Sequence, residues 1–368
     1  MANVVAVCDV DTTHLARATA EVEKKNNRKP VQYADYRKLL ENRDIDAVII
    51  GTPDHWHALQ AVHACQAGKD VYCEKPLTLT LHEGRVMTQV ARQTRRVVQT
   101  GSQQRSDTKF RRGCELVRNG AIGKLHTVKV GLTHVNFNAT TVPDSEPPAE
   151  LNYDLWLGPA PWRPYNKNRV HYNFRFFWDY SGGQMTNWGA HHLDIAQWGL
   201  GMDNSGPVEI EATAKFDPER RFEVPVESEI TYTYPNGVKL LCSQGPERKT
   251  GTTFIGEKGW IHVNRGVLEA SDESILSLEL PPNATRLYVS QDHMDNWFEC
   301  IKTRKAPICD VEIGHRSASV CHLGSLAVRL GRKLRWDPTA EEFPGDAAAN
   351  ARRHYDYRTP WDLPRLVV

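Results

Sequence analysis

The chain has 368 residues, of which 40% are hydrophobic and 25% charged, and its formal net charge is +1. This length and composition are typical of a globular protein with two domains. The basic residues are scattered and no run of about 18 apolar residues occurs, so we expect neither a nucleic-acid nor a membrane partner.

The start, MANVVAVCDVD, lacks the features of a signal peptide, and the eight widely spaced cysteines include no CxxC pair. Both features favour reduced thiols in the cytoplasm. The question of an export signal further upstream stays open in case the sequence is a piece of a longer one.

Residues 1–100 alternate between apolar runs and amphipathic segments. A first helix is predicted from a cap at Thr12 or Thr13 to about Lys25. Strands buried on both faces of a parallel sheet are predicted at NVVAVCDV (3–10), IDAVIIGTP (45–53), DVYCEKP (70–76) and RVVQTGSQQ (96–104). We therefore expect a doubly wound, Rossmann-type α/β domain over residues 1–120.

Residues 121–368 contain strand-like segments without intervening helices, with hairpin signals at YPNG and GEKG. They predict an α+β domain with a largely antiparallel sheet. Two late helices, near 290–304 and 312–331, are expected to pack back on the body. Residues 147–180 form a long aromatic, proline-rich connection, of a kind that is often functional.

Ligands of an open parallel sheet bind outside the carboxyl ends of its strands. Asp9 ends the first predicted strand, where a carboxylate accepts hydrogen bonds from the adenosine ribose, which favours NAD over NADP. A solvated turn residue is the alternative reading of Asp9. The expected dinucleotide contacts at the strand ends are Asp9, Thr52, Pro53, His57, Glu74, Lys75 and Gln103.

Lys75 directly follows a buried strand, and Pro76 stiffens the exit from that strand. A lysine held there beside Glu74 can donate to a substrate hydroxyl and lower the cost of removing its proton. A lone lysine at a strand end is usually only solvated, but the whole string YCEKPLTLT is a stronger signal.

The segment GGQMTNWGAHHLDIAQWGLG holds two adjacent histidines. If residues 187–200 are helical, Asn187, His191 and Asp194 share one face. His191 can then act on substrate while Asp194 or Asn187 orients its ring. His192 faces elsewhere, toward a sugar hydroxyl or a tryptophan. Structural histidines are the alternative, and we expect no metal site because adjacent helical side chains diverge.

Three strings, GTPDHWH, VYCEKPLTLT and GGQMTNWGAHHLD, closely resemble the Gfo/Idh/MocA oxidoreductases, and the resemblance covers nearly the whole chain. It implies that Lys75 is the catalytic lysine and His191 the catalytic histidine. Asp194 matches the downstream acid, and Asn187 stands where the family usually has an aspartate. The resemblance also implies a homodimer or homotetramer. The segment YDLWLGPAPWRPYN looks like a sugar-handling branch related to NAD-dependent α-N-acetylgalactosaminidases.

The chain departs from the family pattern in two places. Asn187 can orient the histidine but cannot stabilise its charged form, so we expect a less raised pKa for His191. No glycine-rich G-x-G-x-x-G turn precedes Asp9, because the chain starts at what should be the second strand of the sheet. Three explanations stay open: a shortened sequence, a protein that has lost dinucleotide binding, or another segment or subunit that fills the gap.

The favoured function is an NAD-dependent oxidoreductase that acts on a hydroxyl carbon of a sugar, glycoside or polyol. An NAD-retaining enzyme that cleaves glycosides by transient C3 oxidation and elimination is the second hypothesis. A non-catalytic relative without dinucleotide binding is the third. The expected substrate contacts, for most of which core packing is the alternative, are Lys75, Trp162, Arg163, Tyr165, Arg175, Tyr180, Asn187, His191 and His192.

Overall fold

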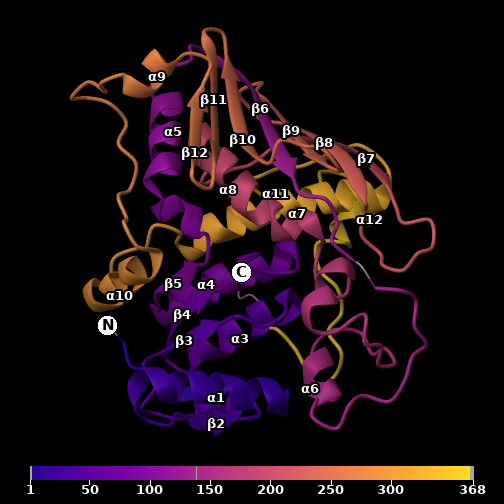
Figure 1. Cartoon of the computed structure of the whole chain (residues 1–368). Coiled ribbons are helices and arrows are strands. Elements are labelled where there is room, and N and C mark those ends of the chain that lie inside the picture. The colour runs from indigo at the N-terminus through magenta and orange to yellow at the C-terminus, as the bar shows by residue number, and fades with distance from the viewer. Residues whose placement is uncertain (1, 138, 365–368) are drawn as a thin grey trace.

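The computed structural model describes residues 2–137 and 139–364. Its first hundred residues alternate short strands with helices (Figure 1). In chain order these are β1 (Ala6–Cys8), α1 (Thr12–Asn26), β2 (Val31–Tyr33), α2 (Tyr36–Leu40), β3 (Ala47–Ile50), α3 (Asp54–Gln66), β4 (Asp70–Cys73), α4 (Leu81–Thr94) and β5 (Val98–Thr100). The parallel α/β class expected from the sequence is confirmed.

The parallel sheet consists of two separate pieces. One piece pairs β1 with β2, and the other has the order β3-β4-β5. No backbone pairing joins β1 to β3 in the part of the chain that the structure describes. Val4 and Val5, just before β1, and Ile49 of β3 have apolar side chains that are 47%, 37% and 58% exposed, respectively. Apolar side chains of both pieces therefore border a gap between β1 and β3.

The β3-β5 piece has its own apolar core, made with α3 and α4. Two late helices, α10 (His293–Thr303) and α11 (Val311–Leu330), pack back on this body. Trp297 of α10 lies against Tyr72 of β4, with ring centroids 5.6 Å apart. Val311 and Ala318 of α11 join the core of α4.

The second domain is an eight-stranded sheet with the order β12-β11-β10-β6-β9-β8-β7-β13. All its neighbours are antiparallel except β6 and β9, so the expected largely antiparallel sheet is confirmed. The strands are β6 (Leu125–Leu132), β7 (Glu209–Lys215), β8 (Glu227–Thr233), β9 (Lys239–Gln244), β10 (Gly251–Gly256), β11 (Gly259–Asn264), β12 (Val267–Ala270) and β13 (Leu334–Arg335).

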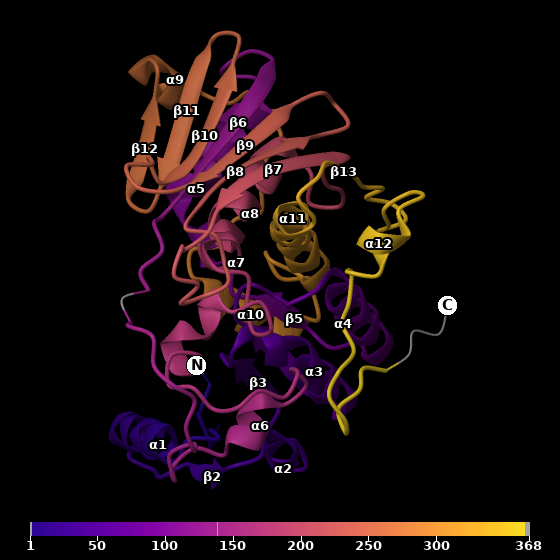
Figure 2. The ribbon, with the colours of Figure 1, turned by 90° about the vertical axis from the view of Figure 1, so that its right-hand side faces the viewer.

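Three helices, α5 (Thr108–Arg118), α8 (Gly189–Leu200) and α11, cover one face of this sheet (Figures 1 and 2). The short elements η1 (Gln103–Ser106), α6 (Tyr153–Leu157), η2 (His171–Phe176), α7 (Gln184–Asn187), α9 (Glu273–Ser277) and α12 (Ala347–Asn350) complete the structure. Helix α11 also packs on α4 and β5, so the helices α7, α8 and α11 lie between the two sheets (Figure 1). No helix within residues 2–137 and 139–364 is long and apolar enough to span a membrane.

Two predicted helix details are wrong. Asp11, rather than Thr12 or Thr13, caps α1, because its carboxylate accepts from the backbone N–H groups of Thr13 and His14. The single helix predicted over 187–200 is two helices, α7 and α8, separated at Trp188. The break turns the backbone carbonyl of Asn187 out of the helical ladder, so that it can accept a hydrogen bond from another element.

Candidate active site

Lys75 reaches from the parallel sheet to the break between α7 and α8. It follows β4, and its Nζ donates to the backbone oxygen of Asn187 at 2.9 Å and to Oδ1 of the same residue at 3.0 Å. The Asn187 amide is itself oriented, because its Nδ2 donates to Gln184 Oε1 at 3.2 Å. Burial lowers the pKa of Lys75, while the nearby carboxylates of Asp54 and Glu74 oppose that shift.

His191 lies in the first turn of α8 and is only 5% exposed. Its Nε2 accepts from Nη2 of Arg265 at 3.2 Å, and its Nδ1 has no partner among the described residues. Burial holds the pKa of His191 well below its usual value, and the charges of Lys75 and Arg265 lower it further. The ring is therefore neutral at pH 7, which is the form that a general base requires.

Arg265 comes from the turn between β11 and β12 and lies over the ring of Trp188, 4.8 Å from its centroid. Its Nε donates to Gln104 Oε1 at 3.3 Å, and Gln104 Nε2 donates to the backbone oxygen of His191 at 3.5 Å. The guanidinium thus covers the nitrogen that would take a proton. A substrate hydroxyl that reaches His191 Nε2 must displace Arg265.

Asp194 does not orient His191, and this prediction is wrong. Its carboxylate pairs with Arg105 at 2.8 Å, with both side chains 1% exposed, and it also accepts from Ser317 Oγ at 2.5 Å. These contacts join α8 to η1 and α11. Asp194 therefore positions the helix that carries His191 and does not touch its ring.

His192 is buried and stacks on Trp188, with ring centroids 6.0 Å apart and an interplanar angle of 12°. Neither ring nitrogen has a partner among the described residues. Burial is the main cause that lowers its pKa to about 3. The sequence left two neighbours open for the His192 ring, a sugar hydroxyl or a tryptophan, and in the structure the ring lies against the tryptophan.

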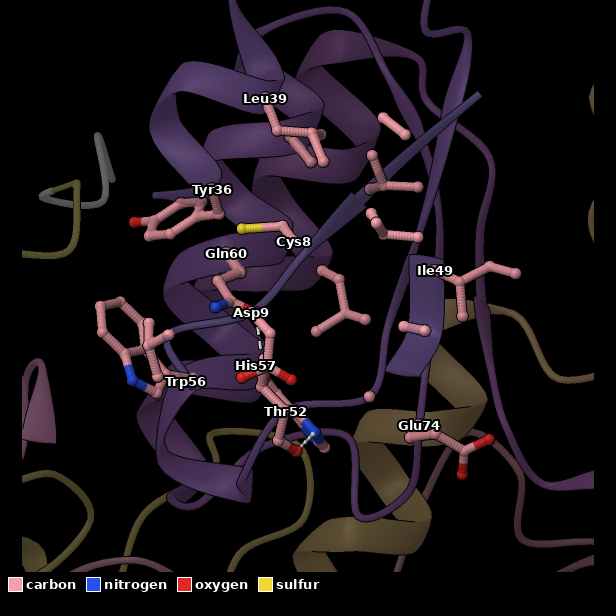
Figure 3. Close-up of a pocket in the computed structure, with 18 of the residues that line it drawn as sticks. Cys8, Asp9, Tyr36, Leu39, Ile49, Thr52, Trp56, His57, Gln60 and Glu74 are labelled. Carbon is pink, nitrogen blue, oxygen red and sulfur yellow. Dashed lines mark hydrogen bonds between the residues drawn. The ribbon is translucent and has the colours of Figure 1, made fainter. Parts of the chain in front are cut away.

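A cavity of ≈1110 Å³ separates the two pieces of the parallel sheet. Figure 3 shows Cys8 and Asp9 on one side of it and Ile49 and Glu74 on the other. Six of the residues expected to contact a dinucleotide line it, whereas Gln103 lies exposed in η1 and outside it. The six are Asp9, Thr52, Pro53, His57, Glu74 and Lys75.

Two of these residues, His57 and Thr52, already form a hydrogen bond with one another. His57 lies between two backbone carbonyls, with Nδ1 2.8 Å from Pro76 O and Nε2 2.8 Å from Thr52 O. The hydroxyl of Thr52 donates to Gln60 Oε1 at 2.9 Å. These side chains fix the loop after β3, so they shape the cavity instead of offering free donors.

The ends of the cavity fit the two ends of a dinucleotide. Asp9 Oδ1 accepts from the backbone N–H of Asp11 at 2.9 Å, which leaves Oδ2 to accept from ribose hydroxyls. Lys75 and Glu74 also line the cavity, and Lys75 contacts Asn187 at the end of α7. Within residues 2–137 and 139–364, no glycine-rich turn approaches the middle of the cavity to hold the diphosphate.

Most of the substrate contacts predicted in the aromatic connection lie outside this cavity. Arg175 lines the cavity, with its guanidinium 4.6 Å from the ring centroids of Tyr172 and Phe174. Trp162 is 67% exposed and outside the cavity, and Tyr180 is fully buried. Tyr180 belongs to an apolar cluster of the connection, so core packing accounts for it.

Arg163 and Tyr165 also have structural partners. Arg163 pairs with Glu223 at 2.8 Å and with Asp179 at 3.2 Å, so its charge is already neutralised. Tyr165 packs edge-on against Tyr153, with centroids 5.3 Å apart. Neither residue lines the cavity, and their contact with substrate stays a prediction.

The sequence analysis missed Asp54, Gln104 and Arg265. Asp54 is buried at the start of α3, accepts from Ser181 Oγ at 2.5 Å, and has a pKa raised by burial. The string GTPDHWH contains Asp54, so its place after a strand was a usable signal. Nothing in the local sequence of Arg265, a hairpin turn, indicates that it reaches His191.

A parallel, dinucleotide-type sheet that carries Lys75, joined to a largely antiparallel-sheet domain that carries His191, is the arrangement of a class of two-domain oxidoreductases. The chain belongs to the Gfo/Idh/MocA family. The family model "Oxidoreductase family, NAD-binding Rossmann fold" matches residues 1–102, and the model "Oxidoreductase family, C-terminal alpha/beta domain" matches residues 106–363.

Solved structures share the fold at low sequence identity. The WlbA dehydrogenase from Bordetella pertussis, in complex with NADH and UDP-GlcNAcA, superposes with a TM-score of 0.67 at 19% identity, covering 90% of each chain. The aldose-aldose oxidoreductase from Caulobacter crescentus, complexed with glycerol, has a TM-score of 0.64 at 22% identity, covering 90% of this chain and 91% of that one.

A shorter match connects the chain to curated relatives. A glycosyl hydrolase family 109 protein from Shewanella putrefaciens is 43% identical over 82 residues. That segment is 21% of this chain and 18% of the relative. The match therefore spans less than a fifth of the relative's length.

Proposed function

We propose that this protein is an NAD-dependent oxidoreductase acting on a hydroxyl carbon of a sugar, glycoside or polyol. The observation that carries the proposal is the meeting of Lys75 with Asn187 one helical turn before His191. We infer that the lysine amine and the neutral imidazole, from two domains, act on one substrate hydroxyl. The carboxylate of Asp9 at the other end of the cavity favours NAD over NADP, because it would repel a ribose phosphate.

In this proposal His191 accepts the proton of the substrate hydroxyl. Lys75 donates to the same oxygen, which stabilises the developing alkoxide. Asn187 holds the lysine amine in place and cannot neutralise it. Bound nicotinamide would supply the hydride acceptor chemistry. Arg265 moves from His191 when the hydroxyl arrives, and it stays close enough to shield the site from water.

The sugar-related molecules named for the fold neighbours support a carbohydrate substrate. The glycosyl hydrolase family 109 segment supports a second candidate, an enzyme that retains NAD and cleaves a glycoside through transient C3 oxidation and elimination. The two differ in cofactor balance. The first accumulates one NADH for each substrate consumed, whereas the second releases the aglycone without NADH accumulation.

The decisive experiment is a calorimetric titration of the folded chain with NAD and with NADP, followed by assays with aldoses, uronates, polyols and aryl glycosides. We expect NAD to bind more tightly than NADP, and at least one carbohydrate to react. If the folded chain binds neither dinucleotide, both enzymatic proposals fail and a non-catalytic relative is favoured. Aryl release without NADH would select the second candidate.

The pH dependence tests the role of Asn187. With a depressed histidine pKa, the neutral base persists below pH ~6.5, so kcat/KM should hold on the acid side. Asn187→Asp adds a negative charge that favours protonated His191, and the acid limb of the profile should move about one pH unit higher. Asn187→Ala, which adds no charge, should lower kcat/KM without moving the limb. An unmoved limb in Asn187→Asp would remove His191 from the role of base.

Homo-oligomerisation and the domain division at residue 120 also remain proposals. Helix α5 packs against α8 and β11, so its contacts are with the second domain. Analytical ultracentrifugation of the purified chain measures the oligomeric state directly.

A further inference from the structure

A second group of polar side chains lies away from Lys75 and His191, where the turn from β1 to α1 meets η2. It consists of Asp11, His14 and His171, with Asp9 alongside, and all four line the cavity. We propose that this group binds a divalent transition-metal ion of the zinc type. The proposal shares Asp9 and the cavity with the proposed dinucleotide site, so its test measures metal binding in the absence of dinucleotide.

Each carboxylate has one oxygen fixed by the backbone and the other turned to an imidazole. Asp11 Oδ1 accepts from the N–H groups of Thr13 and His14, and its Oδ2 lies 3.4 Å from His171 Nε2. Asp9 Oδ1 accepts from the N–H of Asp11, and its Oδ2 lies 4.0 Å from His14 Nδ1. Anchored carboxylates of this kind are typical of metal ligands, because hydrogen bonds orient the ligating oxygen.

The spacing is close to that of a zinc site. One ligand atom each from Asp11, His14 and His171 lies within 4.8 Å of the other two. Bonds of about 2.0–2.1 Å in a tetrahedron separate ligand atoms by about 3.4 Å. The Asp11–His171 pair already has this separation, and the His14 and His171 side chains, 35% and 41% exposed, are free to rotate inward.

The donor types and charge also favour such an ion. Two imidazoles with carboxylates suit zinc, nickel and cobalt better than magnesium or calcium, which prefer oxygen alone. In residues 2–137 and 139–364, the ion-pair partners of Asp9 and Asp11 are histidines, with no lysine or arginine within 4.0 Å. Two carboxylates whose charge is not balanced by a lysine or arginine match one divalent cation.

Because of the position of the cluster, a bound ion would join the β1-α1-β2 unit to another part of the chain. The β1-α1-β2 unit has no backbone pairing with β3, and the connection before α6 holds it instead. Thr12 N donates to Glu150 O at 2.9 Å, and Asn152 N donates to Val10 O at 2.9 Å. A metal shared by Asp11, His14 and His171 would also join this unit to η2, further along the chain, and raise the stability of the unit.

The test is a calorimetric titration of the full chain with ZnCl₂ in buffer free of dinucleotide. We expect one ion per chain, and a loss of affinity of at least ~10-fold in His171→Ala and in Asp11→Asn. Asp11→Asn keeps the helix cap, because asparagine caps as well as aspartate. His126→Ala, an exposed histidine on β6, is the matched control and should bind zinc as the parent does.

Two further readouts decide between outcomes. Cobalt(II) should give the visible absorption of a nitrogen-oxygen site in the parent chain and not in His171→Ala. Zinc should raise the unfolding temperature of the parent and of His126→Ala, and not that of His171→Ala. Circular dichroism confirms that the variants fold. Equal zinc binding by the parent and all three variants, no zinc binding at all, or tighter binding of magnesium than of zinc would each overturn the proposal.

Discussion

Replacement of His191 by alanine should lower kcat/KM for the proposed carbohydrate oxidation by ~10²-fold or more. In the proposed mechanism the neutral imidazole is the base, and among the described residues its Nε2 contacts Arg265. Without it, the substrate proton has to leave to water, and the charge on the alkoxide is less well stabilised. Initial rates of NADH formation over a range of substrate concentrations separate kcat from KM, and the loss should fall on kcat.

Lys75→Ala should produce a loss of similar size. It removes the amine that follows β4 of the parallel sheet and that Asn187 holds in place. Loss of both groups together should cost less than the sum of the two, since they act on one proton transfer. His126→Ala, exposed on β6, controls for the loss of a histidine as such. Small and equal effects of His191→Ala, Lys75→Ala and His126→Ala would contradict the assignment of the pair.

The parts of the fold that depend on local pattern could be predicted from the sequence. Unbroken apolar runs ending in polar residues indicated the parallel strands, and turn signals indicated the hairpins. The position of Lys75 also followed from its place after a strand. Its partner Asn187 is 112 positions away, and their contact was not predicted, because the family resemblance implied a role for each residue and not a hydrogen bond between them.

Spacing alone failed for Asp194, for a physical reason. A separation of three residues places His191 and Asp194 on one side of a helix, but it does not say which side chain finds a stronger partner elsewhere. Arg105, 89 residues earlier, supplies a buried guanidinium to Asp194. A charged pair excluded from water outweighs a hydrogen bond to a neutral ring, so tertiary structure decided the contact.

The aromatic connection shows a second limit. The residue types that stack on sugars are also those that fill a core, and composition does not separate the two uses. Tyr180 became core, Trp162 became surface, and Arg175 alone among the predicted contacts of this segment reached the cavity. The cluster of Asp11, His14 and His171 escaped detection because His171 is brought to the other two by the path of the same connection.

Asp194→Ala should destabilise the protein by about 3–5 kcal/mol, because it leaves the Arg105 guanidinium buried without its main partner. Both side chains are 1% exposed, and the remaining partner, Asp203, is 24% exposed and lies to one side at 2.8 Å. The loss of the Ser317 contact adds to the cost. Denaturant-induced unfolding of the parent and the variant measures the difference in the free energy of unfolding.

The double variant Arg105→Met with Asp194→Ala separates a structural role from a catalytic one. Removal of both charges takes away the unpaired cation, so most of the lost stability should return, and His191 should again be held by α8. Asp203→Ala, which removes the more exposed partner, should cost less than Asp194→Ala. If Asp194→Ala instead unfolds like the parent while kcat/KM falls ~10²-fold, Asp194 acts in catalysis and the structural assignment is wrong.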